Sequence, residues 1–377
     1  MRVDLTEEQS LLKDSVARFV AERYPFDRRQ KVAASAEGYS EEDWQQFAEL
    51  GWLGLPLPEA AGGLGMGPVE VGLLMEAFGR GLVISPYLAT VLMGAGIIAA
   101  AGSPAQQAEI LPAVTEGRMK LSLAFAEDDR QDPAMIAAKA ESDGSGYWLT
   151  GVKTAVPYAA AADRILIVAR TAGRPGDGAG LSFFLVDRRQ PGFEVRDYAA
   201  HDGSRVATLR FERMALGHDR LVGPKDGAYP ILEAVLDRAR AALCAEASGI
   251  AGAIYEKTLS YFKTREQFGK LIGSFQALQH RLTDVYMKAE LLQSVAVDAA
   301  EAAMSSDAAQ RATGVSAAKS LTGTLGREIG KEGVQLHGGI GMTWDYEAGH
   351  YLKRLTFIDL ALGDSHWHLE RYRRLAP

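Results

Sequence analysis

Residues 261–280 combine a basic side chain, an aromatic-glycine turn and two glutamines at spacings that suit anion binding. Arg265 is expected to close one helix, and Phe268 with the glycine after it to turn the chain. A second helix is then expected to present Gln276 and Gln279 near its N-terminus. Because helix N-termini carry unpaired N–H groups and a partial positive charge, an adjacent arginine would complete a cradle for a diphosphate. The alternative interpretation is an ordinary helical hairpin with a charged turn.

A second segment that could bind a ligand comprises residues 335–343, QLHGGIGMT. Glycine permits close approach of the backbone to a ligand and adopts positive φ without steric cost. A cluster such as Gly338 and Gly339, placed after a helix that ends near Gln335, could wrap the diphosphate and adenosine end of a cofactor. The same glycines could instead simply end the helix.

Taken in order, the two segments resemble the C-terminal domain of acyl-CoA dehydrogenases, which carries R-x-x-F-G, F-Q-x-x-Q and Q-x-x-G-G-x-G-x-T. The resemblance covers residues 5–371. It implies FAD as cofactor, an acyl-CoA thioester as substrate, and an electron-transfer flavoprotein as acceptor. In the family these motifs contact the FAD of a neighbouring subunit, which makes the corresponding residues here candidate cofactor contacts: Arg265, Phe268, Gln276, Gln279, Gln335, Gly338 and Gly339.

The family reaction needs a carboxylate that removes the α-proton of the thioester while the β-hydride passes to the flavin. The glutamate of the family's C-terminal E-G-T falls here on Gly363, so Asp364 and Ser365 stand where the Gly-Thr would be. Other members keep the base directly before an arginine, and that position is Ala239, before Arg240. Asp364 is the nearest substitute base, Arg240 is a second catalytic candidate, and Ser365 is a candidate cofactor contact. A helix N-cap is the alternative role for Asp364.

The flavin-ring side also departs from the family pattern. Where the family has T-E-P and W-I-T, this chain has Ala126 and Pro157, whose side chains cannot donate hydrogen bonds. Backbone N–H groups at Phe125 or Ala126 remain candidate contacts to the flavin. His366 lies close enough to the lost base to stay a minor base candidate.

Three runs point to one group within the family: DRARAALCAEASG, YFKTREQFG and LGDSHWHLER. They resemble the small subunit of pimeloyl-CoA dehydrogenase, whose group acts with a second, homologous subunit. The chain is therefore expected to form a homo-oligomer or a heteromer. The leading hypothesis is FAD-dependent α,β-dehydrogenation of an acyl-CoA thioester. The alternatives are an accessory subunit without a base, and a flavin oxidase or monooxygenase on the same fold.

The elements that would position these residues form an α+β, mostly α, architecture of the acyl-CoA dehydrogenase type. Helical spacing favours an N-terminal helical domain over 1–118. Short β-rich runs favour a middle β domain over 119–226. Long amphipathic helices favour a four-helix bundle over 227–377. The expected bundle helices are 231–263, 275–304, 307–337 and 344–374, the last with a break near residue 363. The expected strands are 120–126, 147–149, 164–169, 181–186, 193–197 and 207–211.

Composition narrows the possible functions. The 377 residues carry a net charge of −7, which argues against a nucleic-acid partner. Cys244 is the only cysteine, so no disulfide forms within the chain, which fits a reducing cytoplasm. The apolar run 88–101 is too short to span a bilayer and is expected to form a buried helix. Aspartates 128, 129 and 132 form an expected solvated acidic loop without a metal, because no histidine joins them.

Overall fold

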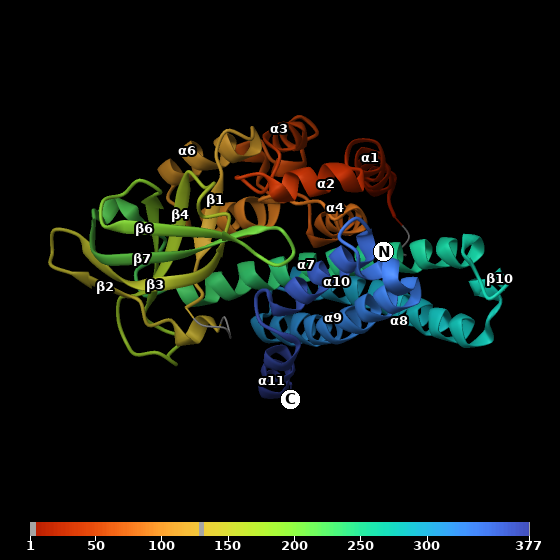
Figure 1. Ribbon diagram of the computed structural model, residues 1–377. Helices are drawn as coiled ribbons and strands as arrows, with labels where there is room; N and C mark the ends of the chain where they lie inside the picture. Colours follow the sequence, from red (N-terminus) through yellow and green to blue (C-terminus); the bar gives the residue numbers. More distant parts are fainter. Residues whose placement is uncertain (1–4, 128–131, 377) are drawn as a thin grey trace. The chain divides into compact units, whose positions relative to one another are not determined.

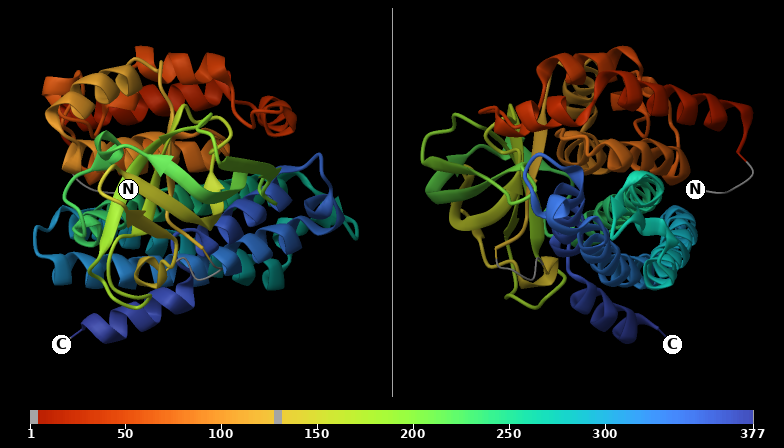
Figure 2. Two further views of the ribbon diagram at one scale, coloured as in Figure 1. Left: turned by 90° about the vertical axis from the view of Figure 1, so that its left-hand side faces the viewer. Right: turned by 45° about the vertical axis from the view of Figure 1, so that its right-hand side comes forward.

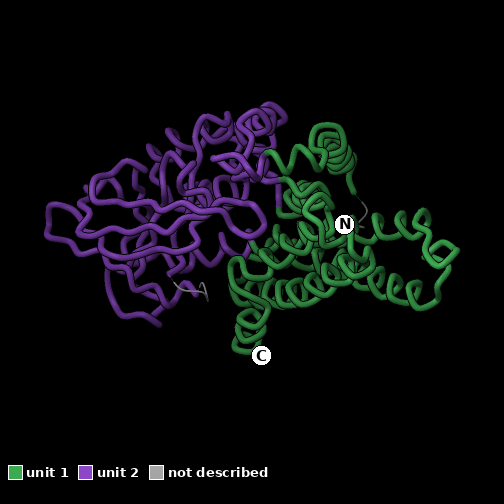
Figure 3. Tube along the Cα trace, in the orientation of Figure 1, with its two compact units in different colours: residues 1–31, 68–83, 240–377 green, residues 32–67, 84–239 purple. Residues whose placement is uncertain are grey.

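The computed structural model describes residues 5–127 and 132–376, and the chain divides into two compact units (Figure 3). Unit 1 comprises Met1–Lys31, Pro68–Val83 and Arg240–Pro377, and unit 2 comprises Val32–Gly67 and Ile84–Ala239. The mostly helical α+β class expected from the sequence is confirmed. The boundaries of the three expected domains stay a prediction.

Unit 1 is built from helices, seen in Figure 1. Its main helices are α1 (Glu7–Arg23), α4 (Pro68–Gly81), most of α7 (Ala228–Thr264), α8 (Gln276–Met304), α9 (Ala308–His337), the short η7 (Gly338–Met342), α10 (Glu347–Leu360) and α11 (Ser365–Leu375), while α2 (Phe26–Ala34) crosses the unit boundary. Helix α9 packs against α8, α10 and α11. The expected break near residue 363 falls between α10 and α11, and the other three expected bundle helices agree with α7, α8 and α9 within a few residues.

Capping and apolar packing explain these helices. Thr6 forms a capping box with Gln9 at the start of α1, and Asp307 accepts two backbone N–H bonds at the start of α9. Ion pairs Arg281–Glu332 and Lys288–Glu328 join α8 to α9. Because the later residue of α8 pairs with the earlier residue of α9, the two helices run antiparallel. They lie side by side in the views of Figure 2. Small apolar side chains fill the space between α7, α8 and α9: Ala241, Cys244, Val295, Ala299, Ala303, Val315 and Ala318.

Unit 2 contains an eight-stranded sheet of order β6-β7-β3-β2-β4-β5-β8, with β1 pairing in parallel with β4. The strands are β1 (Leu121–Ala124), β2 (Lys139–Ser142), β3 (Tyr147–Pro157), β4 (Arg164–Arg170), β5 (Leu181–Asp187), β6 (Phe193–Ala199), β7 (Arg205–Leu216) and β8 (Leu221–Val222). Strands β4 and β5 are buried over nearly their whole length, so the core of the sheet lies along them.

The strand predictions were incomplete. β2 and β8 were not expected: the sequence KAES of β2 has one apolar side chain, the one residue of this strand that is buried, and β8 has only two residues. The strand expected over 147–149 continues to Pro157, and the one expected over 207–211 covers Arg205–Leu216. These two strands pair with each other through two register shifts, and the irregular backbone hides their alternation in the sequence.

Short helices complete unit 2. They are α3 (Glu41–Glu49), η1 (Trp52–Gly54), η2 (Glu59–Ala61), η3 (Leu88–Ala95), α5 (Gly96–Ala101), α6 (Pro104–Thr115), η4 (Pro133–Met135) and η5 (His218–Arg220). The buried helix expected over 88–101 is confirmed, although its first half is a π-helix. Over residues 5–127 and 132–376, no helix combines the length and apolarity that a membrane crossing requires.

Candidate functional site

The turn predicted at Phe268 lies between α7 and α8. Two short strands, β9 (Glu266–Gln267) and β10 (Lys270–Leu271), form a hairpin whose turn has φ 55° at Phe268 and 77° at Gly269. Two successive positive φ angles are typical of a type I′ turn, which matches the twist of a hairpin. Phe268 is 91% exposed, and Arg265, just past the end of α7, is also exposed. The predicted turn is confirmed, and it presents both side chains to solvent.

The N-terminus of α8 follows this hairpin after the short helix η6 (Ile272–Ser274). Its N-cap residue, Phe275, makes no side-chain capping bond, and the first turn contains no acidic residue. Gln276 and Gln279 are exposed there, and Nε2 of Gln279 donates to the carbonyl oxygen of Gly273 at 2.7 Å. The 29-residue helix therefore offers N–H groups and the positive end of its dipole to an anion.

A pocket of about 540 Å³ opens between the last turns of α7 and the first turns of α8. Its walls are mostly apolar, and Gln279 is one of its polar lining residues. The lining comprises Tyr255, Leu259, Phe262, Lys263, Leu271, Gly273, Ser274, Gln279, Leu282, Thr283 and Tyr286.

The glycine segment begins where α9 ends. Gly338 has φ 63° and ψ −143°, a conformation that favours glycine, and a Cβ built on Gly338 or Gly339 would meet no atom within 4 Å. Gln335 and both glycines are exposed. The backbone is thus open to a ligand.

His337 connects the two predicted cofactor segments. Its ring lies between those of Tyr261 and Tyr346, with centroids 4.9 and 5.0 Å away, and its Nδ1 lies 2.7 Å from the carbonyl oxygen of Gly333. Burial lowers the pKa of His337. Because Tyr261 stands one helical turn before Arg265 and His337 directly precedes the glycines, the fold brings both segments to one end of the bundle.

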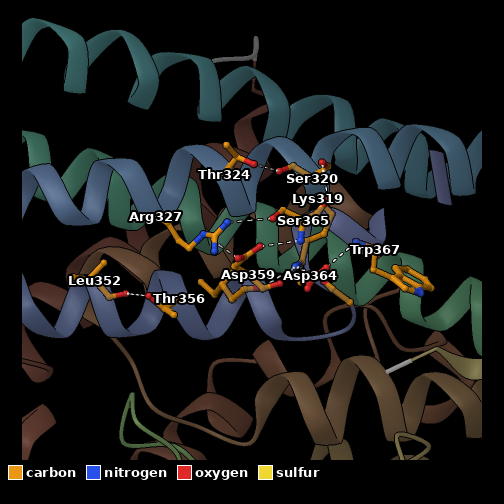
Figure 4. Close-up of polar contacts among 12 residues, drawn as sticks. Lys319, Ser320, Thr324, Arg327, Leu352, Thr356, Asp359, Asp364, Ser365 and Trp367 are labelled. Atoms are coloured by element: carbon orange, nitrogen blue, oxygen red, sulfur yellow. Dashed lines mark hydrogen bonds and ion pairs between the residues drawn. The ribbon is translucent and has the colours of Figure 1, made fainter. Parts of the chain in front are cut away.

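The turn between α10 and α11 contains Gly363, on which the sequence resemblance places the family's base. Asp364 is the N-cap of α11, and its Oδ1 accepts the N–H of Trp367 at 2.7 Å (Figure 4). The N-cap interpretation is therefore confirmed, while a base role for Asp364 stays a prediction. Gly363 has φ 100°, and a Cβ there would lie 2.5 Å from Cε3 of Trp367. This backbone path consequently leaves no room for a carboxylate side chain at position 363.

The other candidates near this turn are held by different contacts. Arg240 is fully buried, and its Nε donates to the carbonyl oxygen of Leu362 at 3.0 Å. The N–H of Ser365 donates to Oδ1 of Asp359 at 3.0 Å. His366 is exposed, so its ring does not point into the buried interior of the turn.

Buried His368 also faces this turn. Its Nε2 lies 3.1 Å from the carbonyl oxygen of Leu362. Burial, and the positive charges of Arg240, Lys319 and Arg371, hold its pKa well below the ordinary histidine value. His368 is therefore neutral near pH 7.

Lys319 was missed by sequence reasoning. It lies on α9 with no exposed side-chain surface, and burial lowers its pKa to about 8. Its Nζ donates to three backbone carbonyl oxygens at the end of α10 and in the following turn. The available signal was its place on the apolar face of α9, four residues after Val315.

In unit 2, Phe125 and Ala126 follow β1 and are buried. The carbonyl oxygen of Phe125 accepts a bond from Nζ of Lys153 at 3.0 Å, and that of Ala126 accepts the N–H of Thr154 at 2.9 Å. Lys153 also pairs with Glu127 at 2.6 Å. These bonds fix the backbone of the two candidate residues.

Of the expected acidic loop, only Asp132 lies within the described residues. Aspartates 128 and 129 lie outside the described residues. Asp132 accepts the N–H of Ala134 at 3.0 Å, a helix-capping bond. Within the described part of the chain, no group of three histidine, cysteine or acidic side chains could hold a metal ion.

Comparison with known proteins gives a consistent result along the whole chain. Residues 6–118, 122–214 and 225–375 match the family models for the N-terminal, middle and C-terminal domains of acyl-CoA dehydrogenase. Mitochondrial isovaleryl-CoA dehydrogenase from Pongo abelii is 29% identical over 376 residues, covering 96% of this chain and 86% of that protein.

Two solved structures illustrate the structural likeness. The Tcur3481-Tcur3483 steroid ACAD G363A variant is 31% identical with a TM-score of 0.88, covering 98% of this chain and 97% of that one. The ChsE4-ChsE5 complex from Mycobacterium tuberculosis is 27% identical with a TM-score of 0.88, covering 99% of this chain and 98% of that one.

Proposed function

The chain belongs to the acyl-CoA dehydrogenase family, and from this premise we propose that it takes part in FAD-dependent α,β-dehydrogenation of an acyl-CoA thioester, with an electron-transfer flavoprotein as acceptor. The observation that carries the proposal is the pair of anion-binding features at one end of the bundle. One is the N-terminus of α8 beside Arg265, and the other is the open backbone at Gly338 and Gly339.

The residues present fit the diphosphate of FAD. The uncapped N–H groups of α8 favour an anion, and the exposed guanidinium of Arg265 adds a full positive charge with several donors. The glycines leave space at their surface, and exposed Gln335 and Gln276 add neutral hydrogen-bonding groups. We propose that these residues hold the diphosphate and that Phe268 packs against the cofactor, across a subunit interface as in the family.

When bound, FAD supplies the two-electron acceptor for the hydride that leaves Cβ of the thioester. The chain's own task is to remove the α-proton and to keep the reacting groups in place. Asp364 is the carboxylate we propose for the proton when this chain acts alone. Its Oδ1 caps α11, so Oδ2 is the oxygen left to accept the proton.

A second candidate function is favoured by the same turn: an accessory subunit whose homologous partner supplies the base. Asp364 is engaged as a cap, the position of Gly363 has no room for a side chain, and Ala239 at the alternative base position is fully buried. The similarity to the ChsE4-ChsE5 complex supports an assembly of this kind. In such an assembly, Arg265 and the glycine segment would serve the partner's flavin.

The test is anaerobic reduction of the flavin by acyl-CoA thioesters, followed by its visible absorbance. It is run with this chain alone, with Asp364→Asn, and with the chain mixed with its closest homologue from the same source. Bleaching by the isolated chain that is lost in Asp364→Asn supports the dehydrogenase with its own base. Bleaching only in the mixture, at equal rates for wild type and Asp364→Asn, supports the accessory subunit. Absence of bleaching in every sample refutes both candidates.

A further inference from the structure

The ammonium group of Lys319 is fully engaged by backbone. Its Nζ lies 2.7 Å from the carbonyl oxygen of Ile358, 3.0 Å from that of Asp359 and 3.0 Å from that of Gly363. A protonated lysine has three N–H donors, so each donor has one acceptor. The first two acceptors belong to the last turn of α10, where carbonyls lack helical partners and the helix dipole is negative. Lys319 therefore caps α10 from the neighbouring helix α9.

The third acceptor extends this cap across the turn. Gly363 lies beyond the end of α10, immediately before the N-cap of α11. One side chain thus ties the end of one helix to the start of the next.

Asp359 and Ser320 hold the same segment from two further directions (Figure 4). Oδ1 of Asp359 accepts the N–H of Ser365 at 3.0 Å, and its Oδ2 lies 3.1 Å from Nε of Arg327. The hydroxyl of Ser320 donates to the carbonyl oxygen of Ser365 at 2.9 Å. Helix α9 packs tightly against Asp359, because a Cβ at Gly323 would lie 1.9 Å from Oδ1 of Asp359.

The turn needs such support because its backbone is unfavourable. Leu362 has φ 60° and Gly363 has φ 100°. A residue with a side chain in the left-handed region is strained, and it persists where the surroundings impose this conformation. Loss of the bond to Gly363 would let the turn relax.

We propose that Lys319 is a positioning residue that fixes the backbone of residues 363–365 and so sets the placement of Asp364 and Ser365. It acts through three hydrogen bonds to carbonyl oxygens and not through contact with substrate. The structural part of the inference stands on these contacts. The link to reactivity rests on the proposed function, in which Asp364 and Ser365 are a candidate base and a candidate cofactor contact.

Amide hydrogen exchange of the intact chain without added flavin tests the structural part. The variants are Lys319→Met, which keeps the apolar stem and removes the donors, and Lys319→Gln, which keeps two N–H donors on a shorter stem. Thr324→Ala is the matched control, because among the described residues the hydroxyl of Thr324 bonds only to the carbonyl oxygen of Ser320 in its own helix. The amides of Ser365 and Trp367 report on the turn.

We expect protection at Ser365 and Trp367 to fall at least about tenfold in Lys319→Met, less in Lys319→Gln, and not in Thr324→Ala, with α8 unchanged in all three. A packing role for the stem predicts the opposite order, with Met closer to wild type than Gln, and that order would overturn the proposal. So would wild-type protection in Lys319→Met. If Lys319→Met does not fold, Lys319→Gln decides: wild-type protection at both amides refutes the proposal, and selective loss supports it.

Flavin-loaded protein separates this proposal from the proposed function. We expect both Lys319 variants to lower the rate of flavin reduction in the same order, Met more than Gln, and to raise the dissociation constant of FAD in that order, because Ser365 is displaced with the turn. Failure of the wild-type chain to bind FAD would remove the proposed function and leave the exchange result intact. Normal exchange with a normal reduction rate would remove the positioning role alone.

Discussion

Nζ of Lys319 lies 3.0 Å from the carbonyl oxygen of Gly363, the residue on which the family resemblance places the missing carboxylate. At this position, the chain presents a backbone carbonyl to a buried cation, and the φ of 100° directs any added Cβ against Trp367. The turn that carries Gly363 is therefore held by contacts of its own. Restoring a side chain here should disturb the turn before it restores chemistry.

Gly363→Ala should lower the free energy of unfolding by more than about 3 kcal/mol, because positive φ and a clash with the Trp367 ring act together. Gly176→Ala is the control: its φ is also 100°, but no atom lies within 4 Å of the built Cβ, so only about 1–2 kcal/mol should be lost. Urea denaturation measures both. Equal losses of unfolding free energy in the two variants would show that the Trp367 ring moves aside without destabilising the protein, and would contradict the prediction.

The role of Asp364 as a cap predicts different effects for two substitutions. Asp364→Asn keeps an oxygen for the N–H of Trp367 and should unfold like wild type, whereas Asp364→Ala should lose about 1 kcal/mol of stability. Thermal and urea unfolding measure the difference. Indistinguishable stabilities for Asn and Ala would contradict the capping role.

Buried His368 should make stability depend on pH. Its folded pKa lies well below the unfolded value of about 6.5, so below that pH the unfolded chain binds a proton that the folded chain does not. Stability contributed by this residue is thus present above about pH 6.5 and falls by up to about 1.4 kcal/mol for each pH unit below it.

The measurement is urea denaturation between pH 7 and 5 for wild type, His368→Gln and His366→Gln. His368→Gln should flatten the acid decline, while exposed His366→Gln should leave it as in wild type. An equally steep decline in His368→Gln would contradict the assignment.

The sequence predicted the local features that depend on neighbouring residues. The Phe268-Gly269 turn, the helix start at Asp364, and the extents of α8 and α9 follow from capping and periodicity, and the structure confirms them. Strands β2 and β8, and the π form of the expected helix at Leu88–Ala95, were not predicted, because pairing and packing with distant segments override their local patterns.

In the candidate site, too, the sequence predicted local motifs but not contacts between distant segments. The sequence placed Arg265 and the glycine segment in two motifs, and the contact between the rings of His337 and Tyr261 explains how the fold unites them. It could not reveal the cap formed by Lys319, since the acceptors are backbone carbonyls 39 to 44 residues away and carry no side-chain signature.

The most direct test of the central claim is the dissociation constant of FAD for wild type, Arg265→Ala and the control Arg174→Ala, measured by flavin fluorescence with and without the homologous subunit. The side chain of Arg174 is 88% exposed and lies in the other unit. Arg174→Ala therefore removes one positive charge, as Arg265→Ala does, without changing the candidate site. The account predicts that Arg265→Ala weakens FAD binding by about 10- to 100-fold at unchanged helix content, the loss expected for a charge-assisted contact to the diphosphate. Arg174→Ala should bind like wild type. An unchanged dissociation constant in Arg265→Ala, in both samples, would contradict the claim that this end of the bundle holds the cofactor.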